Sequence, residues 1–213
     1  MAKVGWQTYS FGADVFGTTA FLLTSIGSTY CNFVKFTSIG GAITDYFGLW
    51  RYGQYAFVTT GQQSWIYQGC FPYANSVEID SNWKAARAFN AIVLFSGFAF
   101  FITSALSACM GNRTVERPQI IVGVWLLLLC LFSGLSLLVL DSNLCKDNVL
   151  LGELGQFVFN DRCELSTGAN CVVSATVFWF LAALCSLSAS QSKSEEENQE
   201  LDGLIEPLIH EGV

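Results

Sequence analysis

Few residues in this sequence have the types and spacing that catalysis requires. The only histidine, His210, lies near the C-terminus, so the rest of the chain has no imidazole for a catalytic dyad, a triad or a zinc site. The sequence also has no P-loop and no dinucleotide-binding glycine motif. We therefore expect a protein that is not an enzyme and that uses no cofactor and no metal.

Cysteine is the one reactive side chain that is abundant, with eight residues. Five of them lie in or beside two long polar stretches of the chain: Cys31, Cys70, Cys145, Cys163 and Cys171. This placement favours an oxidising compartment, in which disulfides persist. A bond between Cys145 and Cys163 would contribute about 3 kcal/mol through loop closure and would leave Cys171 unpaired.

Long uncharged segments indicate how these cysteines are positioned. Only 13% of the residues are charged and the mean hydropathy is +0.45, which is unusual for a water-soluble domain. No charged residue lies between Arg87 and Arg113, between Arg117 and Asp141, or between Glu164 and Lys193. Each gap exceeds the ~20 residues with which an α-helix crosses the hydrocarbon layer of a membrane. We expect spanning helices over residues 88–110, 120–140 and 172–189.

A fourth, weaker span is expected over residues 8–28, because it would bring both ends of the chain to the same side of the membrane. It contains Asp14, and an intramembrane carboxylate is a functional candidate by default. Since the other spans offer no basic partner, we favour a structural interpretation, with Asp14 near the inner surface, hydrated or bonded to a neighbouring helix. Ala13 and Gly17 form a small-xxx-small pair, which permits close helix packing.

The four spans divide the chain into a membrane domain, residues 1–190, and a tail, residues 191–213. The short segments on one side carry basic residues near helix ends, which favours the cytosol: Lys3, Arg113, Arg117 and Lys193. Both termini are then cytosolic, and the cysteine-bearing loops, about residues 30–87 and 141–171, lie outside. We expect a multi-pass protein of the plasma membrane, with the endosomal or vacuolar membrane as the alternative.

The first outer loop is rich in aromatic and β-branched residues interrupted by glycine, which favours a small antiparallel β-sheet. It contains Gly48-Leu49-Trp50, and it ends in Asn82-Trp83-Lys84-Ala85-Ala86-Arg87. The two motifs resemble those of the claudin family of four-span membrane proteins, to which the peripheral myelin and lens-fibre tetraspans belong. They have the same order along the chain, the same separation and the same place in the topology as in that family. The resemblance covers about residues 1–117.

This resemblance implies an all-α membrane protein, a four-helix transmembrane bundle with a small extracellular antiparallel β-sheet. Trp50 is similar to the tryptophan that wedges the sheet onto the bundle, and Arg87 to the arginine that closes the far end of the loop. Members of the family usually have two cysteines in this loop, bonded to each other. Gly53 occupies the position of the first cysteine here, whereas Cys70 matches the second. Cys70 therefore needs another partner, either Cys31, which we favour, or a cysteine of the second loop.

The acidic tail lacks a pattern able to bury a core, and we expect it to be disordered. Within it, Glu200 stands four residues before Leu204-Ile205. This spacing resembles the acidic dileucine signals of endosomal or vacuolar sorting, which clathrin adaptors bind. The tail is therefore a candidate adaptor-binding segment.

Two non-enzymatic functions are consistent with these features. The first is membrane assembly or adhesion, through self-association or contacts with other membrane proteins, for which aromatic residues of the first loop are candidates: Trp65, Tyr67, Phe71 and Tyr73. The second is an auxiliary subunit that controls the trafficking or gating of an ion channel or receptor. Membrane lipid is the expected surrounding of either, and the net charge of −7 argues against nucleic acid as a partner.

Overall fold

The computed structural model describes residues 5–38, 44–60, 63–74, 77–110, 119–146 and 163–210, with the side chains of 54–60, 63–68, 110 and 196–210 left outside the description. Its helices are α1 (Trp6–Thr29), α2 (Ser81–Met110), α3 (Gln119–Leu135), the 3₁₀ helix η1 (Ser136–Asp141), α4 (Asn143–Lys146) and α6 (Thr167–His210). Its strands are β1 (Val34–Thr37), β2 (Thr44–Phe47), β3 (Arg51–Thr60), β4 (Gln63–Pro72) and β5 (Glu164–Leu165).

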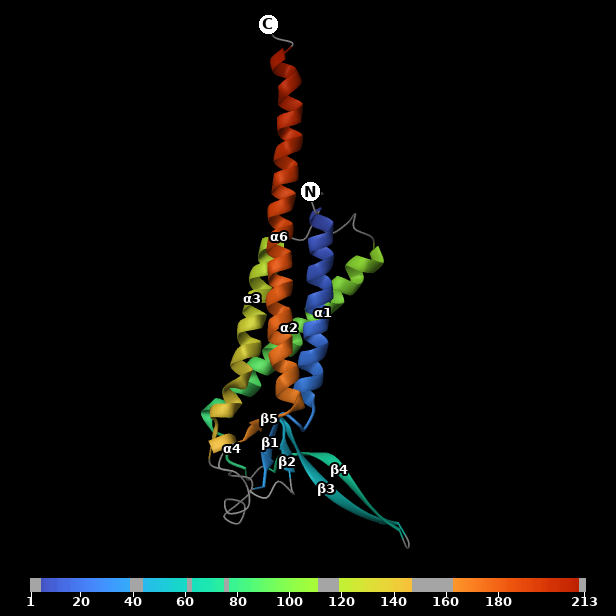
Figure 1. The fold of residues 1–213 in the computed structure, drawn as a ribbon, viewed down its shortest axis with the longest axis vertical. Helices are drawn as coiled ribbons and strands as arrows, with labels where there is room; N and C mark the ends of the chain where they lie inside the picture. The colour runs from blue at the N-terminus through green and yellow to red at the C-terminus, as the bar shows by residue number, and fades with distance from the viewer. Residues whose placement is uncertain are drawn as a thin grey trace.

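The four long helices form a bundle with the sheet at one end and both chain termini at the other (Figure 1). Helix α6 packs along both α1 and α3, and α2 contacts α1 on one side and α3 with η1 on the other. We call the two ends of the bundle the sheet end and the termini end. The first outer loop of the sequence analysis thus lies at the sheet end together with the second.

Three helices in the described part of the chain are long and apolar enough to cross a membrane, over Ser81–Cys109, Gln119–Asp141 and Thr167–Glu195. Apart from Met110, they contain the three spans predicted from the uncharged gaps, and they indicate a multi-pass membrane protein. Large apolar side chains on the outside of the bundle agree with lipid contact, for example Phe95, which is 78% exposed. Helix α1 is not in this set, because small and polar residues lower its hydropathy.

Small residues let α1 approach its neighbours closely. A Cβ atom on Gly27 would lie 2.5 Å from the carbonyl oxygen of Gly168 in α6, and one on Gly168 would lie 2.7 Å from that of Gly27. Gly17 lies against the Phe100 ring of α2, and Ala13 is buried. The predicted packing role of the Ala13 and Gly17 pair is therefore confirmed.

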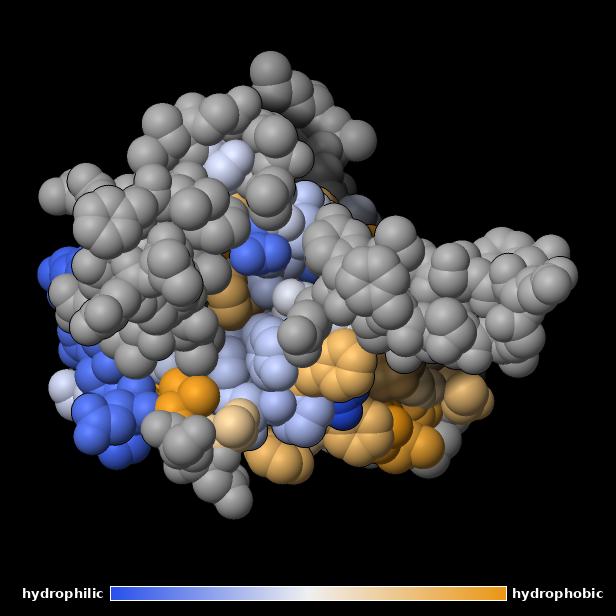
Figure 2. Space-filling view, turned by 90° about the horizontal axis from the view of Figure 1, so that it is seen from below, coloured by the Kyte–Doolittle hydropathy of each residue, from blue (hydrophilic) through white to orange (hydrophobic). Residues whose placement is uncertain are grey.

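The sheet is antiparallel with strand order β4-β3-β2-β1-β5, as predicted for the first loop. Its last strand comes from the second loop, where Leu165 pairs with Val34, and this contribution was not predicted. Strands β3 and β4 form a long hairpin that projects past the bundle (Figure 1). Seen from the sheet end, hydrophilic residues gather on one side of the molecule and hydrophobic residues on the other (Figure 2).

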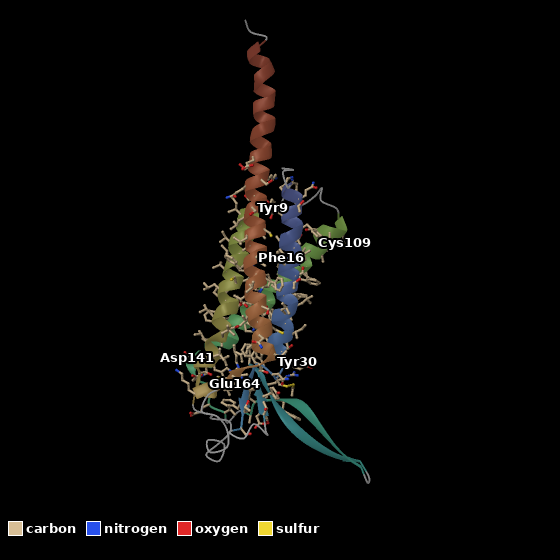
Figure 3. The ribbon with its side chains drawn as sticks, viewed as in Figure 1. Tyr9, Phe16, Tyr30, Cys109, Asp141 and Glu164 are labelled. Carbon is tan, nitrogen blue, oxygen red and sulfur yellow. A yellow bond between two sulfur atoms is a disulfide. The ribbon has the colours of Figure 1, made fainter. Side chains whose placement is uncertain are left out.

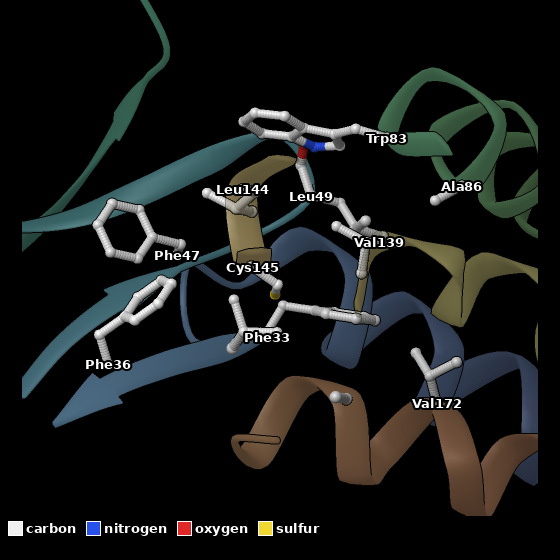
Figure 4. Packing of buried hydrophobic residues seen from close by; sticks show 12 residues of the cluster. Phe33, Phe36, Phe47, Leu49, Trp83, Ala86, Val139, Leu144, Cys145 and Val172 are labelled. Carbon is white, nitrogen blue, oxygen red and sulfur yellow. The ribbon is translucent and has the colours of Figure 1, made fainter. Parts of the chain in front are cut away.

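Two clusters of buried residues hold these parts together. One joins the sheet to the bundle and includes Phe33, Leu49, Trp83 and Val172 (Figure 4). The other lies within the bundle around Trp179. The first cluster draws side chains from both loops and from α2 and α6, so the sheet depends on the bundle for its core.

Two helix boundaries differ from the prediction. Helix α2 begins at Ser81, seven residues before the predicted span, because Asp80 caps it: its carboxylate accepts a hydrogen bond from the Trp83 amide at 3.0 Å. Helix α6 continues to His210, where the sequence predicts a disordered tail from residue 191. Glu, Gln and Leu are good helix formers, and they extend a helix that the bundle has already nucleated.

Candidate functional site at the sheet end

The Gly48-Leu49-Trp50 segment is a tight turn between β2 and β3. The Gly48 amide donates to the Arg51 carbonyl at 2.7 Å. A Cβ atom on Gly48 would lie 2.5 Å from the Tyr30 carbonyl oxygen and 2.8 Å from that of Arg51, so no larger residue fits. The Tyr73 hydroxyl donates to the Gly48 carbonyl at 2.7 Å and fixes the turn from the other side.

The carbonyl of Leu49 is the point at which the two predicted motifs meet. It accepts hydrogen bonds from the indole nitrogen of Trp83 at 3.2 Å and from Nε of Arg87 at 2.6 Å. Figure 4 shows the Trp83 indole nitrogen directed at this oxygen. Both donors lie on α2, one helical turn apart, and the Leu49 and Trp83 side chains are fully buried.

The Arg87 guanidinium lies among three aromatic rings. Its Cζ atom is 4.8 Å from the centroid of Trp83, 5.2 Å from that of Trp50 and 5.5 Å from that of Tyr73. Such contacts stabilise a cation through the ring quadrupoles. Gly48, Leu49, Trp50 and Arg87 are thus brought together in one site, a juxtaposition that the sequence analysis did not predict.

The predicted role of Trp50 as a buried anchor is wrong. Trp50 is 41% exposed, whereas Leu49 and Trp83 are each 0% exposed. The turn directs Leu49 inward and Trp50 outward, so the wedge between sheet and bundle consists of Leu49 and Trp83. Trp83 was visible in the sequence only as part of the second motif, and no anchoring role was assigned to it.

Tyr73 also differs from its prediction as an exposed contact residue. Its ring packs edge-on against Trp83, with centroids 5.0 Å apart, and its burial raises the pKa of the phenol above the usual value of 10.0. Phe71 is half-buried and packs against Tyr52. The side chains of Trp65 and Tyr67 lie outside the described residues.

Asp80 joins the two loops, a role that the sequence analysis missed. One carboxylate oxygen accepts from the Trp83 amide at 3.0 Å, and the other accepts from the Asn143 amide at 3.0 Å. One side chain therefore caps the first turns of both α2 and α4. The N-cap signature of Asp before Ser-Asn-Trp was readable in the sequence, but its second partner was not.

Both preferred disulfides are present, Cys31–Cys70 and Cys145–Cys163, and Cys171 is free. The competing bond from Cys70 to the second loop is therefore excluded. Gly53 is the strand partner of Cys70, so the cysteine that the family pattern has there would have faced Cys70 directly. The Cys31–Cys70 bond instead ties the root of the hairpin to the end of α1.

At the termini end, polar side chains join all four helices. Ser104 of α2 donates to the Asp14 carboxylate of α1 at 2.6 Å, which confirms that Asp14 is bonded to a neighbouring helix. Gln119 of α3 lies 3.4 Å from the Ser10 hydroxyl of α1 and accepts from Ser186 of α6 at 2.9 Å through its backbone carbonyl. Tyr9 and Cys109 mark this end in Figure 3, and Tyr30, Asp141 and Glu164 mark the sheet end.

The remaining predicted site lies on the far part of α6. Glu200, Leu204 and Ile205 fall within the helix, but their side chains are outside the described residues. Within the described chain, no three His, Cys, Asp or Glu side chains group closely enough to hold a metal ion. No family model and no curated protein sequence matches this chain.

Proposed function

We propose that α1 is a fourth membrane span and that the chain is a claudin-like tetraspan. Tyr9 lies in the first turn of α1 and Tyr30 directly follows its last residue, so a helical rise of about 31 Å separates them, close to the ~30 Å of a hydrocarbon core. Tyrosines are enriched at both surfaces of a membrane. The polar contacts from Ser10 and Asp14 to α2 and α3 also support a place for α1 within the bundle.

The sheet end faces the cell exterior in this proposal, and both termini are cytosolic. Support comes from the two disulfides, which lie at the sheet end and persist in oxidising compartments. The plasma membrane is the proposed location. A tag on the C-terminus should stay unlabelled on intact cells and become labelled after permeabilisation, and labelling of intact cells would reverse the orientation.

The function that we propose is membrane assembly or adhesion through the β3–β4 hairpin, without catalysis. The observation that carries this proposal is the outer strand β4: β3 is its only partner among the described strands, and the hairpin projects past the bundle. No charged residue lies between Arg51 and Glu78. Charges are the usual device that prevents edge-to-edge pairing, so an uncharged edge strand is suited to binding another strand.

A charge placed on the edge strand tests this function. Gln68→Lys adds a charge on β4, and Gln68→Asn changes the same side chain without adding a charge as a matched control. In cells, wild type and Gln68→Asn should crosslink into oligomers or gather at cell contacts, and Gln68→Lys should do neither while reaching the surface normally. A wild-type protein that stays monomeric and spread evenly over the surface would overturn the proposal.

The auxiliary-subunit function remains a second proposal because of a groove between α2 and α3. It has a volume of about 540 Å³ and a largely apolar lining that includes Phe95, Ala99, Thr103, Ile121 and Trp125. Ala99 and Thr103 form a small-xxx-small pair, which lets another transmembrane helix approach. Ala99→Leu should then abolish co-purification with a larger membrane protein in fixed stoichiometry, and the absence of any such partner for wild type would remove this function.

The tail supports a separate proposal about sorting. Leu204→Ala with Ile205→Ala should raise the surface level of the protein if clathrin adaptors bind the acidic dileucine sequence with Glu200. Leu201→Ala is the matched control, since it removes a leucine at a variable position of the signal, between Glu200 and Leu204. Equal surface levels for all three proteins would show that the sequence is not a signal.

A further inference from the structure

Arg87 has hydrogen-bonding capacity that the protein does not use. A guanidinium carries five N–H donors, and in Arg87 only Nε–H has a partner among the described residues, the Leu49 carbonyl. Arg87 is half-buried, so part of its side chain remains accessible. The three rings surround the guanidinium, and its two terminal nitrogen atoms have no hydrogen-bond partner among the described residues.

Two further cations belong to the same two motifs. Lys84 is exposed one turn earlier on the same side of α2, and Arg51 is exposed next to Trp50, whose ring contacts Arg87. Among the residues that the structure describes, no carboxylate is within salt-bridge distance of these three side chains. The other described cations of the sheet end differ, since Lys35 pairs with Glu164 and Lys146 with Asp141.

The carboxylate of Asp80 does not pair with these cations. Its two oxygens accept hydrogen bonds from backbone amides, those of Trp83 and Asn143. Among the described residues, Arg51, Lys84 and Arg87 therefore have no carboxylate partner. Such a site is complementary to an anion with several acceptor oxygens.

The position of Arg87 identifies the anion. Arg87 is the last charged residue before the uncharged run that begins at Ala88, so it lies at the boundary of the hydrocarbon layer. Trp50 and Tyr30 are 41% and 59% exposed, and the Tyr30 carbonyl lies against Gly48, so two exposed aromatic residues share this depth. At that depth, the abundant anion is the phosphate of a phospholipid.

We propose that Arg87, assisted by Lys84 and Arg51, binds the phosphate group of a phospholipid in the sheet-side leaflet. The fork of Arg87 matches two phosphate oxygens, and the outward ring of Trp50 covers the glycerol region. The binding requires that the bundle sits in a membrane, but it does not depend on assembly through the hairpin. The lipid would brace the Gly48-Leu49-Trp50 turn from the membrane side.

Solid-state NMR in phosphatidylcholine nanodiscs tests this inference. The protein is labelled with ¹³C-arginine, and the ³¹P of a bound lipid should dephase the Cζ signal of Arg87. The difference between the spectra of wild type and Arg87→Lys assigns that signal to Arg87. In native mass spectrometry, Arg87→Lys should weaken phosphatidylcholine binding about tenfold, the effect of losing one charge-assisted hydrogen bond. Lys84→Gln should weaken it by a smaller factor, and the matched control Lys146→Gln, whose lysine already has a carboxylate partner, should leave it unchanged.

Several results would overturn the proposal. Equal dephasing in wild type and Arg87→Lys would show that lipid contacts are not specific to this site. Saturation of the site in detergent by soluble glycerophosphocholine, at the affinity of the intact lipid, would identify a free-phosphate site instead. Equal binding of a galactosyl diacylglycerol, which has no phosphate, would exclude phosphate recognition. Gln68→Lys in the hairpin should keep full dephasing, which separates this inference from the assembly function.

Discussion

Arg87 at the sheet end and Asp14 at the termini end are both ionisable residues in a setting of low polarity, and the protein holds them differently. At the sheet end, Arg87 is held by one carbonyl and three aromatic rings. At the termini end, Asp14 accepts a hydrogen bond from the Ser104 hydroxyl of the neighbouring helix. The sheet end also has both disulfides, an aromatic cluster and a helix cap that serves two loops.

The difference follows from what each end must do. The sheet end assembles two loops that are distant in sequence onto a bundle, and a small sheet cannot supply its own core. Its contacts therefore combine burial of large rings with charge-assisted hydrogen bonds. The termini end only keeps four helices in register, and hydrogen bonds between membrane helices contribute little each, about 0.6 kcal/mol on average. We expect mutations at the sheet end to be the more damaging.

Trp83→Ala should have the largest effect. Trp83 is fully buried between sheet and bundle, so its loss should lower the free energy of unfolding by about 3–5 kcal/mol. Trp50→Ala is the matched control, and its loss of an exposed cation–π contact should amount to about 1 kcal/mol or less. Unfolding of both variants in detergent, followed by tryptophan fluorescence or size-exclusion chromatography, measures the contrast. A more damaging Trp50→Ala would restore Trp50 as the anchor.

Removal of a disulfide should come next. Cys145→Ser with Cys163→Ser opens a loop whose closure contributes about 3 kcal/mol. Cys171→Ser, in which a free thiol is replaced, should stay within about 0.5 kcal/mol of wild type. Thermal unfolding with and without reductant should reproduce the difference, because reductant acts on the sheet end alone among the described contacts. A wild-type protein that is indifferent to reductant would contradict this expectation.

Tyr73 should make the stability of the sheet end dependent on alkaline pH. Burial raises the pKa of its phenol above the ordinary value of 10.0, so the folded protein retains a proton that the unfolded chain releases. The contribution of Tyr73 is therefore complete below about pH 10 and decreases as the pH rises further. When the pH is raised from 8 to 10.5, the melting temperature should fall more for wild type than for Tyr73→Phe.

A control variant makes this measurement specific. Tyr73→Phe should also lose about 1 kcal/mol at pH 8, because the hydrogen bond to the Gly48 carbonyl is removed. Tyr30→Phe, at a tyrosine that is 59% exposed, should show the same pH dependence as wild type. If Tyr73→Phe and wild type lose stability in parallel, the Tyr73 phenol ionises as freely as one in water.

The sequence predicts some of these features because they depend on local composition or on one residue type. Uncharged runs are sufficient to identify three spans, and the cysteines in the loops are sufficient to suggest both disulfides. The inward direction of Leu49 and the outward direction of Trp50 are set by a turn whose shape depends on Tyr30 and Tyr73. Such contacts join residues that are far apart in the sequence, and a motif read along the chain does not contain them.

The same reason explains the other differences. Strand β5 has only two residues, and it is defined by its partner β1 rather than by any alternation of its own. The tail has the composition of a disordered segment, but it follows directly on a packed helix, so no new nucleation is needed. Asp80 has one contact of each kind. Its N-cap position can be predicted from the local sequence, whereas its hydrogen bond from the distant Asn143 amide cannot.

The smallest predicted effect is at the termini end, and its size tests whether the two ends of the bundle differ. Ser104→Ala removes a donor to Asp14, and the two residues should show a coupling of about 0.6 kcal/mol in a double-mutant cycle with Asp14→Ala. Asn keeps an acceptor oxygen, so Asp14→Asn alone should change stability little if the group serves only to join α1 to α2. A coupling of several kcal/mol would mean that Asp14 is a buried charge that depends on Ser104, and the termini end would then resemble the sheet end. Unfolding measurements on the four proteins of the cycle, in one detergent and at one pH, distinguish the two outcomes.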